Sequence, residues 1–193
     1  MKTKFIYLLL CSILLLTGCS SSLNEDVAEN TEYVTVGNTL KVKNTDEQLT
    51  LLDNKEALAA EGLYYATWVI GNSEPYKNSD GDTVDLYDAQ LYLLLVKAKN
   101  SEDAQDNADT WLAAAKTNYE IITEKEDSFN GQSYSIITYN CKGIDTPYDH
   151  GISAFCTFKD SALCIELTCQ ETFTGDLEPI LTNFLNNCQY YTD

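Results

Sequence analysis

The chain has 193 residues, and its 30 acidic residues against 12 lysines and no arginine give a formal net charge of −18. This charge disfavours nucleic acid and anionic lipid headgroups as partners, because both repel a negative surface. The lack of arginine also removes the side chain that best holds phosphate or carboxylate through two hydrogen bonds. A cationic partner, a divalent metal ion and a neutral glycan remain compatible, as does the simpler interpretation that the charge provides solubility.

The N-terminus has the pattern of an export signal. Lys2 and Lys4 introduce the apolar run 5–16, which is shorter than the roughly 20 residues of a membrane-spanning helix. The tetrapeptide Leu16-Thr17-Gly18-Cys19 follows that run and resembles a bacterial lipobox. The resemblance implies that residues 1–18 are a cleaved signal peptide and that Cys19 carries a diacylglyceryl thioether. We therefore expect a protein at the cell membrane, anchored through lipid on Cys19 and facing outside the cytoplasm.

Two alternatives to this N-terminal assignment are a transmembrane helix and an ordinary signal peptide that is not lipidated. The first needs a longer apolar run, and the second does not require a cysteine directly after the cut. Residues 19–31 are polar and acidic, which predicts a flexible tether. Residues 32–193 are expected to form a single folded ectodomain.

The first elements of this ectodomain are short. Alternating residues in 32–36 and 39–43 flank Gly37-Asn38, which predicts a hairpin. A further short strand is expected over 49–52. The run 53–56 has the spacing of a capping box, so we predict a short helix after it that ends at Gly62.

Two stronger strands and a long connection follow. Residues 63–70 are strand-like, and 89–98 alternate with apolar side chains on both faces, which predicts a central strand covered on both sides. The polar segment 71–88 between them is expected to be a loop. Long ordered loops are often functional, so this loop is the candidate contact surface. Its candidate contact residues are Tyr76, Asn78, Asp80, Asp82, Asp85 and Tyr87.

The middle of the chain predicts a helix and a hairpin. An apolar stripe from Ala104 to Ala115 has helical spacing, with a start near Asn100 or Ser101. Residues 119–124 and 132–140 then flank Asn130-Gly131, the dipeptide preferred in tight hairpin turns.

The last third predicts a second hairpin and a terminal helix. If Asp160-Ser161 is a two-residue turn, Phe158 opposes Leu163 and Cys156 opposes Ile165. One face of this hairpin is then wholly apolar, as register requires for a buried face. The terminal helix starts near Asp176, and its apolar stripe runs from Leu177 to Cys188. The apolar face of the hairpin holds Ile152, Ala154, Cys156, Phe158, Leu163, Ile165, Leu167 and Cys169, and the opposite face holds Cys164 and Glu166.

The order of elements indicates an α+β fold: one domain with an antiparallel β-sheet and helices packed on its faces. This order resembles the PsbP/Mog1-like α/β/α sandwich over most of residues 50–190. The resemblance rests on element order and carries no signature motif, so it implies a fold and transfers no active-site residue.

Five cysteines of the ectodomain lie in its last third, which in an exported protein suggests disulfides. Facing surfaces would allow Cys188 to pair with Cys156 or Cys169, and Cys164 with Cys141. The alternative is that all five are reduced and act as small buried hydrophobic residues. Cys164 and Cys169 point to opposite faces of a strand, so they do not converge on a zinc ion.

Two other sites deserve a hypothesis. Asn78, Asp80, Asp82 and Asp85 offer hard oxygen ligands in one loop, which makes calcium a weak candidate, although the pattern lacks the closing glutamate of an EF-hand. The alternative is a solvated turn.

The single histidine, His150, has Asp149 beside it and could act as the base for a cysteine or serine nucleophile, but a solvated turn residue is the simpler interpretation.

Two functions follow from these observations. The first is a lipid-anchored cell-surface protein without a catalytic role or cofactor, which binds an unknown protein or glycan partner or supports an envelope assembly. The alternative is an extracellular hydrolase that uses His150 or a carboxylate pair. The hydrolase requires a cleft in which His150 lies within hydrogen-bond distance of a thiol, hydroxyl or carboxylate.

Overall fold

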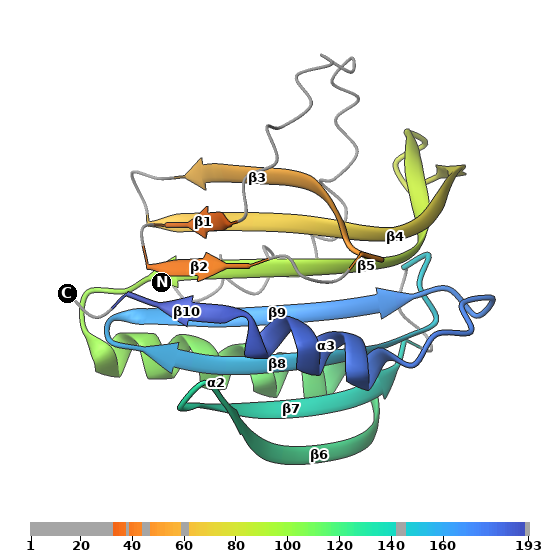
Figure 1. Cartoon of the computed structure of the whole chain (residues 1–193). Coiled ribbons are helices and arrows are strands. Elements are labelled where there is room, and N and C mark those ends of the chain that lie inside the picture. Colours follow the sequence, from red (N-terminus) through yellow and green to blue (C-terminus); the bar gives the residue numbers. More distant parts are fainter. Residues whose placement is uncertain (1–32, 38, 44–46, 59–61, 142–145, 192–193) are drawn as a thin grey trace.

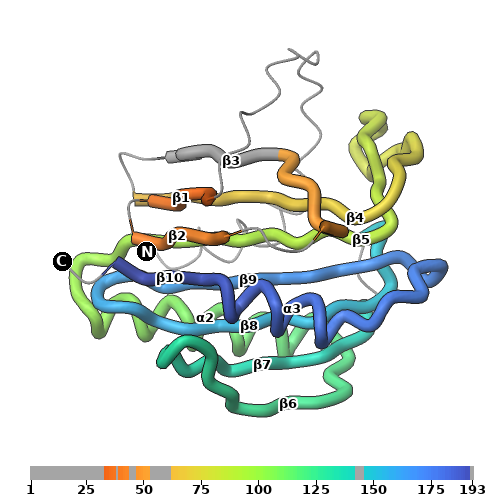
Figure 2. Tube along the Cα trace, in the orientation of Figure 1, coloured from red at the N-terminus to blue at the C-terminus, as the bar shows by residue number. Residues whose placement is uncertain are grey.

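The computed structural model describes residues 33–37, 39–43, 47–58, 62–141 and 146–191 (Figures 1 and 2). Lipidation at Cys19 and the tether 19–31 lie outside these residues. The large sheet has seven antiparallel strands in the order β3-β4-β5-β9-β8-β7-β6, and a small sheet has the order β1-β2-β10. The strands are β1 (Val34–Val36), β2 (Leu40–Val42), β3 (Thr50–Leu58), β4 (Leu63–Lys77), β5 (Thr83–Lys97), β6 (Glu120–Phe129), β7 (Gln132–Asn140), β8 (His150–Phe158), β9 (Ser161–Cys169) and β10 (Cys188–Tyr190). The helices are α2 (Ser101–Asn118) and α3 (Leu177–Asn186).

The centre of the large sheet is buried on both faces. Leu91, Leu93 and Leu95 of β5 belong to the larger apolar core, whereas Tyr92 and Leu94 belong to a second core on the other face. The prediction of a central strand covered on both sides is therefore confirmed. Figure 1 shows α2 behind the sheet, and α3 and the small sheet in front of it.

The predicted class, a single mixed domain with an antiparallel sheet, is confirmed. Strands predominate among the described residues, and the small sheet occupies part of the face that the α/β/α layering gives to a helix. Val36 and Leu40 of this small sheet join Phe184 of α3 in the larger core. β1 lies at the edge of the small sheet, and only three residue pairs join it to β2.

Local sequence signals placed several elements correctly. Asn100 caps α2, since its side-chain Oδ1 accepts a hydrogen bond from the backbone N–H of Asp103 at 2.9 Å. Asn130 and Gly131 have φ of 50° and 77° at the turn between β6 and β7, as a tight hairpin turn requires. The hairpin expected around Gly37-Asn38 forms from β1 and β2.

The helix predicted after residues 53–56 is wrong at Ala57 and Leu58, which lie in β3, and its residues 59–61 lie outside the described part of the chain. β3 continues as a strand to Leu58 and pairs with β4, with Asp53 opposite Thr67 and Leu58 opposite Leu63. A helix of about one turn is costly to nucleate, whereas a neighbouring strand offers a hydrogen-bond partner for every second residue. Pairing with β4 therefore stabilises this segment more than the local capping pattern could stabilise a short helix.

The last third needs two corrections. The turn between β8 and β9 is Lys159-Asp160, with φ of 54° at Lys159, and Cys156 opposes Leu163 instead of Ile165. A slip by two residues leaves every side chain on its predicted face, because side chains alternate with a period of two. In addition, α3 ends at Asn186, so Cys188 begins β10 opposite Val42 and is not part of the helix.

The loop predicted over 71–88 is also wrong, because this segment extends β4 and β5 into a hairpin, here called the arm. Its strands pair from Ser73 opposite Tyr87 to Lys77 opposite Thr83. The pairing is irregular between Ile70 and Ser73, and there Figure 1 shows the hairpin bending away from the sheet. The polar pattern of 71–88 indicated a loop because neither strand of the arm buries a face in the core.

Gly71 has a positive φ of 82°, and an added Cβ would lie 1.9 Å from Oδ2 of Asp88. We predict that Gly71→Ala lowers the free energy of unfolding by clearly more than the roughly 1–2 kcal/mol of a strained φ alone. Gly81→Ala is the matched control, because Gly81 has a φ of 89° and no such contact. Urea unfolding of both variants tests this, and equal losses would mean that the Asp88 side chain moves aside without cost.

Candidate functional site

The arm is held at its base, and no described strand pairs with it beyond that point. β3 pairs with β4 only up to Val69, and β9 pairs with β5 only as far as Ala89. Among the described residues, no strand pairs with the outer edges of the arm. At the base, the backbone N–H and side-chain Nε2 of Gln170 donate to the carbonyls of Asp88 and Tyr87 at 3.0 and 2.9 Å. The arm is thus an anchored ribbon with two open edges.

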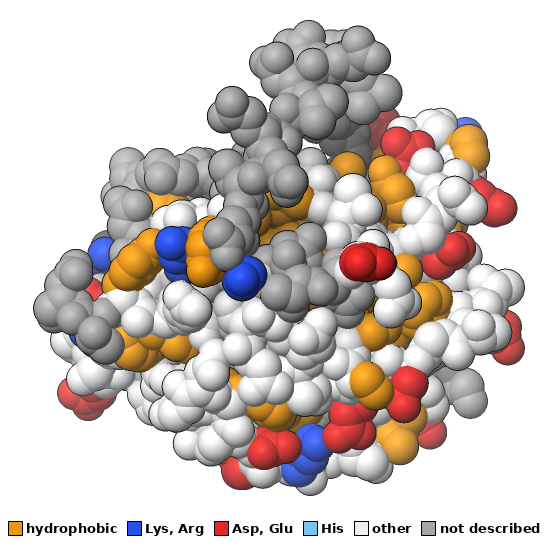
Figure 3. Space-filling model, in the orientation of Figure 1, with side chains coloured by type: hydrophobic (Ala, Val, Ile, Leu, Met, Phe, Trp, Pro, Cys, Tyr) orange, Lys and Arg blue, Asp and Glu red, His pale blue; other side chains and the backbone are white. Residues whose placement is uncertain are grey.

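The side chains of the arm are mostly exposed, and five of them are acidic. Figure 3 shows carboxylates gathered along it at the right of the view. Cross-strand pairing puts Tyr76, Val84 and Leu86 on one face, all partly exposed, and Tyr87 on the other face. The two predicted aromatic contacts therefore point in opposite directions. One lysine, Lys77, accompanies the five acidic side chains Glu74, Asp80, Asp82, Asp85 and Asp88.

The four calcium candidates lie at or near the tip of the arm. Asn78 Oδ1 accepts a hydrogen bond from the backbone N–H of Asp82 at 2.8 Å, and the carbonyl of Asn78 accepts from Gly81 at 3.0 Å. Asp85 lies farther back, opposite Pro75. The described part of the chain contains no group of three or more histidine, cysteine, aspartate or glutamate side chains arranged to hold a metal ion. The candidates form a turn and part of a strand.

His150 has the thiol neighbour that the hydrolase hypothesis requires. Its Nε2 lies 3.0 Å from Sγ of Cys169, directly across the β8–β9 pair. Cys169 is fully buried, however, and burial followed by the charge of Asp149 raises the pKa of its thiol to about 12. The Asp149 carboxylate accepts the backbone N–H of Glu171 at 2.7 Å. A nucleophilic cysteine needs access and a stabilised thiolate, and Cys169 has neither.

Cys141, Cys156, Cys164, Cys169 and Cys188 are all free and buried in the structure, so the described residues contain no disulfide. Their faces match the prediction: Cys156, Cys169 and Cys188 lie in the larger core, and Cys141 and Cys164 in the core beneath α2. Burial raises the pKa of the Cys141 and Cys156 thiols to about 12. These residues serve as small apolar side chains.

A buried carboxylate lies beneath α2, and sequence reasoning missed it. Glu166 of β9 is 9% exposed, and its Oε1 accepts hydrogen bonds from the hydroxyls of Tyr139, Tyr119 at 3.3 Å and Ser153 at 3.4 Å. Tyr119 stacks on Tyr139 with ring centroids 4.1 Å apart. Burial raises the pKa of Glu166 above its ordinary value, although these hydrogen bonds act in the opposite direction.

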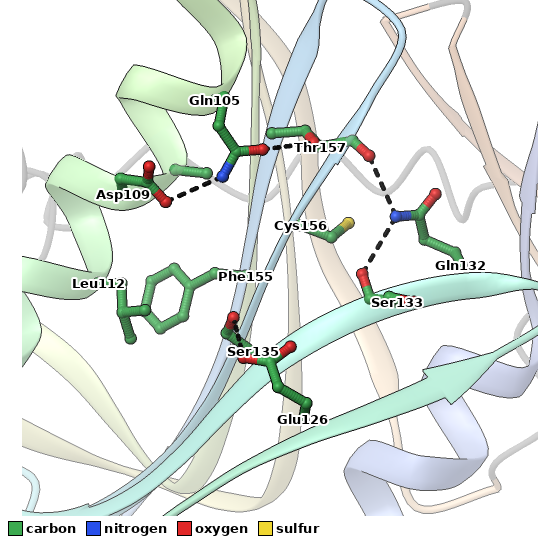
Figure 4. Close-up of a pocket in the computed structure, with 11 residues that line it drawn as sticks. Gln105, Asp109, Leu112, Glu126, Gln132, Ser133, Ser135, Phe155, Cys156 and Thr157 are labelled. Atoms are coloured by element: carbon green, nitrogen blue, oxygen red, sulfur yellow. Dashed lines mark hydrogen bonds between the residues drawn. The ribbon is translucent and has the colours of Figure 1, made fainter. Parts of the chain in front are cut away.

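A groove lies between α2 and the strands β6, β7 and β8, with a cavity of about 230 Å³ (Figure 4). Gln105, Asp109 and Leu112 line it from the helix, and Glu126 and Ser135 line it from the strands. The groove was not foreseen, because its walls meet only when β6 folds back to the edge of the sheet. Together with the arm, it is a candidate surface for a ligand among the described residues.

No family model and no curated protein matches the chain. The solution structure of the cyanobacterial PsbP protein (CyanoP) from Synechocystis is similar, with a TM-score of 0.40, 13% identity and coverage of 75% of this chain and 93% of that chain. A crystal structure from Bacteroides thetaiotaomicron has a TM-score of 0.38 and 8% identity, and covers 83% of this chain and 48% of that one.

A third similar structure is a protein of unknown function from Pseudomonas aeruginosa, with a TM-score of 0.37, 13% identity and coverage of 60% of this chain and 95% of that one. No activity or residue role comes to this chain from these three structures. Among the described residues, no helix combines the length and apolar character needed to cross a membrane.

The buried Glu166 makes stability depend on pH. Its folded-state pKa is raised, so the folded chain holds this proton to higher pH than the unfolded chain does. Its contribution is then most favourable below the unfolded pKa of about 4.3 and declines as pH rises through the folded pKa. We predict that Glu166→Gln, which cannot titrate, removes this decline.

Urea unfolding of both proteins between about pH 4 and pH 8 measures the difference. Stability of the unsubstituted protein should fall relative to Glu166→Gln by about 1.4 kcal/mol for each unit by which the pKa is raised. Glu120→Gln, which makes the same change at an exposed position of the edge strand β6, is the matched control. Parallel curves for the unsubstituted protein and Glu166→Gln would contradict a raised pKa at Glu166.

Proposed function

We propose that this chain is a lipid-anchored protein of the bacterial cell surface that binds a partner through the arm and has no catalytic role. The supporting observation is the arm itself, an acidic two-stranded ribbon with both edges open and a partly apolar face. Lipid on Cys19 would hold the domain at the membrane, because the large excess of acidic residues gives the chain no electrostatic attraction to anionic headgroups.

The chemistry of the arm favours a protein partner with a basic surface. Its acidic side chains supply long-range attraction and faster encounter. Tyr76, Val84 and Leu86 supply an apolar patch, and tyrosine is enriched at protein interfaces. The open edges offer backbone N–H and C=O groups to an added strand, a common way to bind an extended peptide. A glycan would gain from the tyrosines but not from the charge.

The hydrolase alternative has weaker support. Its one favourable observation is the contact between His150 and Cys169, and that thiol is buried with a raised pKa. The carboxylate-pair version has a pair of groove residues, Asp109 and Glu126, as its nearest candidates. Both side chains are exposed, whereas the acid of such a pair is usually held in a pocket that excludes water. We therefore retain binding as the proposed function.

The lipid anchor predicts a simple difference between two cysteine substitutions. Cys19→Ala should lose incorporation of a labelled fatty acid and leave the membrane fraction, because no second anchor would remain. Cys11→Ala, within the same signal, should keep both properties. Labelling and fractionation of cells that express each variant test this. Cys19→Ala that remains labelled would rule out lipidation at this residue.

The arm predicts a charge-dependent interaction. Asp80→Asn with Asp85→Asn should reduce in-cell crosslinking to the partner several-fold, because the arm loses two of its exposed carboxylates. Glu102→Gln with Asp106→Asn removes two exposed carboxylates from α2 and is the matched control. Replacement of residues 71–88 by Asn-Gly should abolish the crosslinks, since Ile70 and Ala89 are paired and a two-residue turn can join them.

Both sets of variants should keep their thermal stability to within a few degrees, which separates lost binding from lost folding. Added salt should weaken the interaction of the unsubstituted protein, since exposed charges are screened. If all variants gave the same crosslinked products, the arm would not be the contact surface. Loss of crosslinks in the α2 control alone would assign the contact to the helix face instead.

A further inference from the structure

The groove between α2 and β6–β8 has fixed polar walls. On the helix, Gln105 Nε2 donates to Asp109 Oδ1 at 2.9 Å, and Gln105 Oε1 accepts from the hydroxyl of Thr157 at 3.2 Å. On the strands, the hydroxyl of Ser135 donates to Glu126 Oε1 at 2.6 Å. Figure 4 shows Asp109 and Glu126 projecting from opposite walls. Each carboxylate is thus oriented, and each keeps a second oxygen for which the described residues give no hydrogen bond.

The charge of the groove is unbalanced. Among the described residues, no lysine lines the groove, and neither Asp109 nor Glu126 takes part in an ion pair. Lys125, the neighbour of Glu126, points to the opposite face of the sheet and contacts Glu178 of α3 at 2.5 Å. Among the described residues, Asp109 accepts a hydrogen bond only from the neutral amide of Gln105, and Glu126 only from the neutral hydroxyl of Ser135. A positive group that enters the groove would therefore meet two uncompensated carboxylates.

The floor of the groove is defined here as the apolar lining residues Phe155, Ala108 and Leu112. Phe155 and Ala108 are each 5% exposed, and Figure 4 shows the partly exposed Leu112 beside Phe155. This surface suits methylene groups and disfavours a fully hydrated ion, which would lose water without replacement contacts. A cavity of about 230 Å³ holds a small organic molecule, although it is smaller than the pockets that enclose most drug-sized ligands.

From the oriented carboxylates, the missing positive charge and the apolar floor, we infer that the groove binds an aliphatic ammonium compound. One or two primary ammonium groups would contact Asp109 and Glu126, and a short methylene chain would lie on Phe155 and Leu112. A free diamine and the lysine side chain of a peptide share this chemistry. The inference is independent of the arm, so either can fail without the other.

Calorimetric titration of the purified full chain in a neutral detergent tests the inference with 1,5-diaminopentane. We expect saturable binding of one molecule and a loss of roughly tenfold in affinity for Asp109→Asn and for Glu126→Gln, because each removes one charge-assisted contact. Glu102→Gln with Asp106→Asn again serves as control and should bind like the unsubstituted protein. The uncharged 1,5-pentanediol should not bind.

A second ligand distinguishes the two possible sources of the ammonium group, a free diamine and the lysine side chain of a peptide. Acetyl-lysine methylamide, with its side-chain amine unmodified, represents a peptide lysine; binding of it alone, with the same dependence on Asp109 and Glu126, would assign the groove to a protein partner's lysine. Absence of saturable binding by either amine at millimolar concentration would overturn the inference. So would equal affinity for the diol, or binding that Asp109→Asn and Glu126→Gln leave unchanged.

Discussion

The pairing of β5 with β9 is the constraint on which the rest of the structure depends. It joins nine consecutive residue pairs, from Ala89 opposite Cys169 to Lys97 opposite Ser161, across more than 60 positions of the chain. It also unites two halves that are each built from neighbouring strands, β3-β4-β5 and β9-β8-β7-β6. Because α2 carries the chain from β5 over one face to the far edge, β9 must return to the middle. The groove, the buried Glu166 and the emergence of the arm all follow from this return.

Elements that bury apolar side chains in the core could be predicted from the sequence, whereas elements formed by polar residues could not. The alternating leucines of β5, the stripe of α2 and the Asn130-Gly131 turn are local signals, and each led to the right element. The faces of β8 and β9 were right even though their register was wrong by two. The arm and the second half of β3 were missed for one reason: their polar residues pair with other strands, and pairing between backbones leaves no hydrophobic period in the sequence.

The candidate sites show why acidic residues gave so little information on their own. Acidic residues that the sequence does not distinguish lie in three different environments. Asp80 is exposed at the tip of the arm, Glu126 lines the groove, and Glu166 lies under α2 with three hydroxyl donors. Glu166 was assigned to the face opposite the apolar one without any expectation that this face is also covered. Only the position of α2 over β8 and β9 reveals that a carboxylate there must be buried.

If Cys19 carries the lipid, the small sheet would be the first part of the fold to bear a force applied through the tether. Tension between membrane and partner would then enter the fold at β1, which is an edge strand joined to β2 by three residue pairs. β2 is in turn joined to β10 by three further residue pairs, and Asn130 Nδ2 donates to the carbonyl of Cys188 at 3.0 Å, so the strands after β1 are tied to the rest of the fold at additional points. A pull on the tether would peel β1 away first and lengthen the reach of the domain, while the seven-stranded sheet and both candidate surfaces kept their shape.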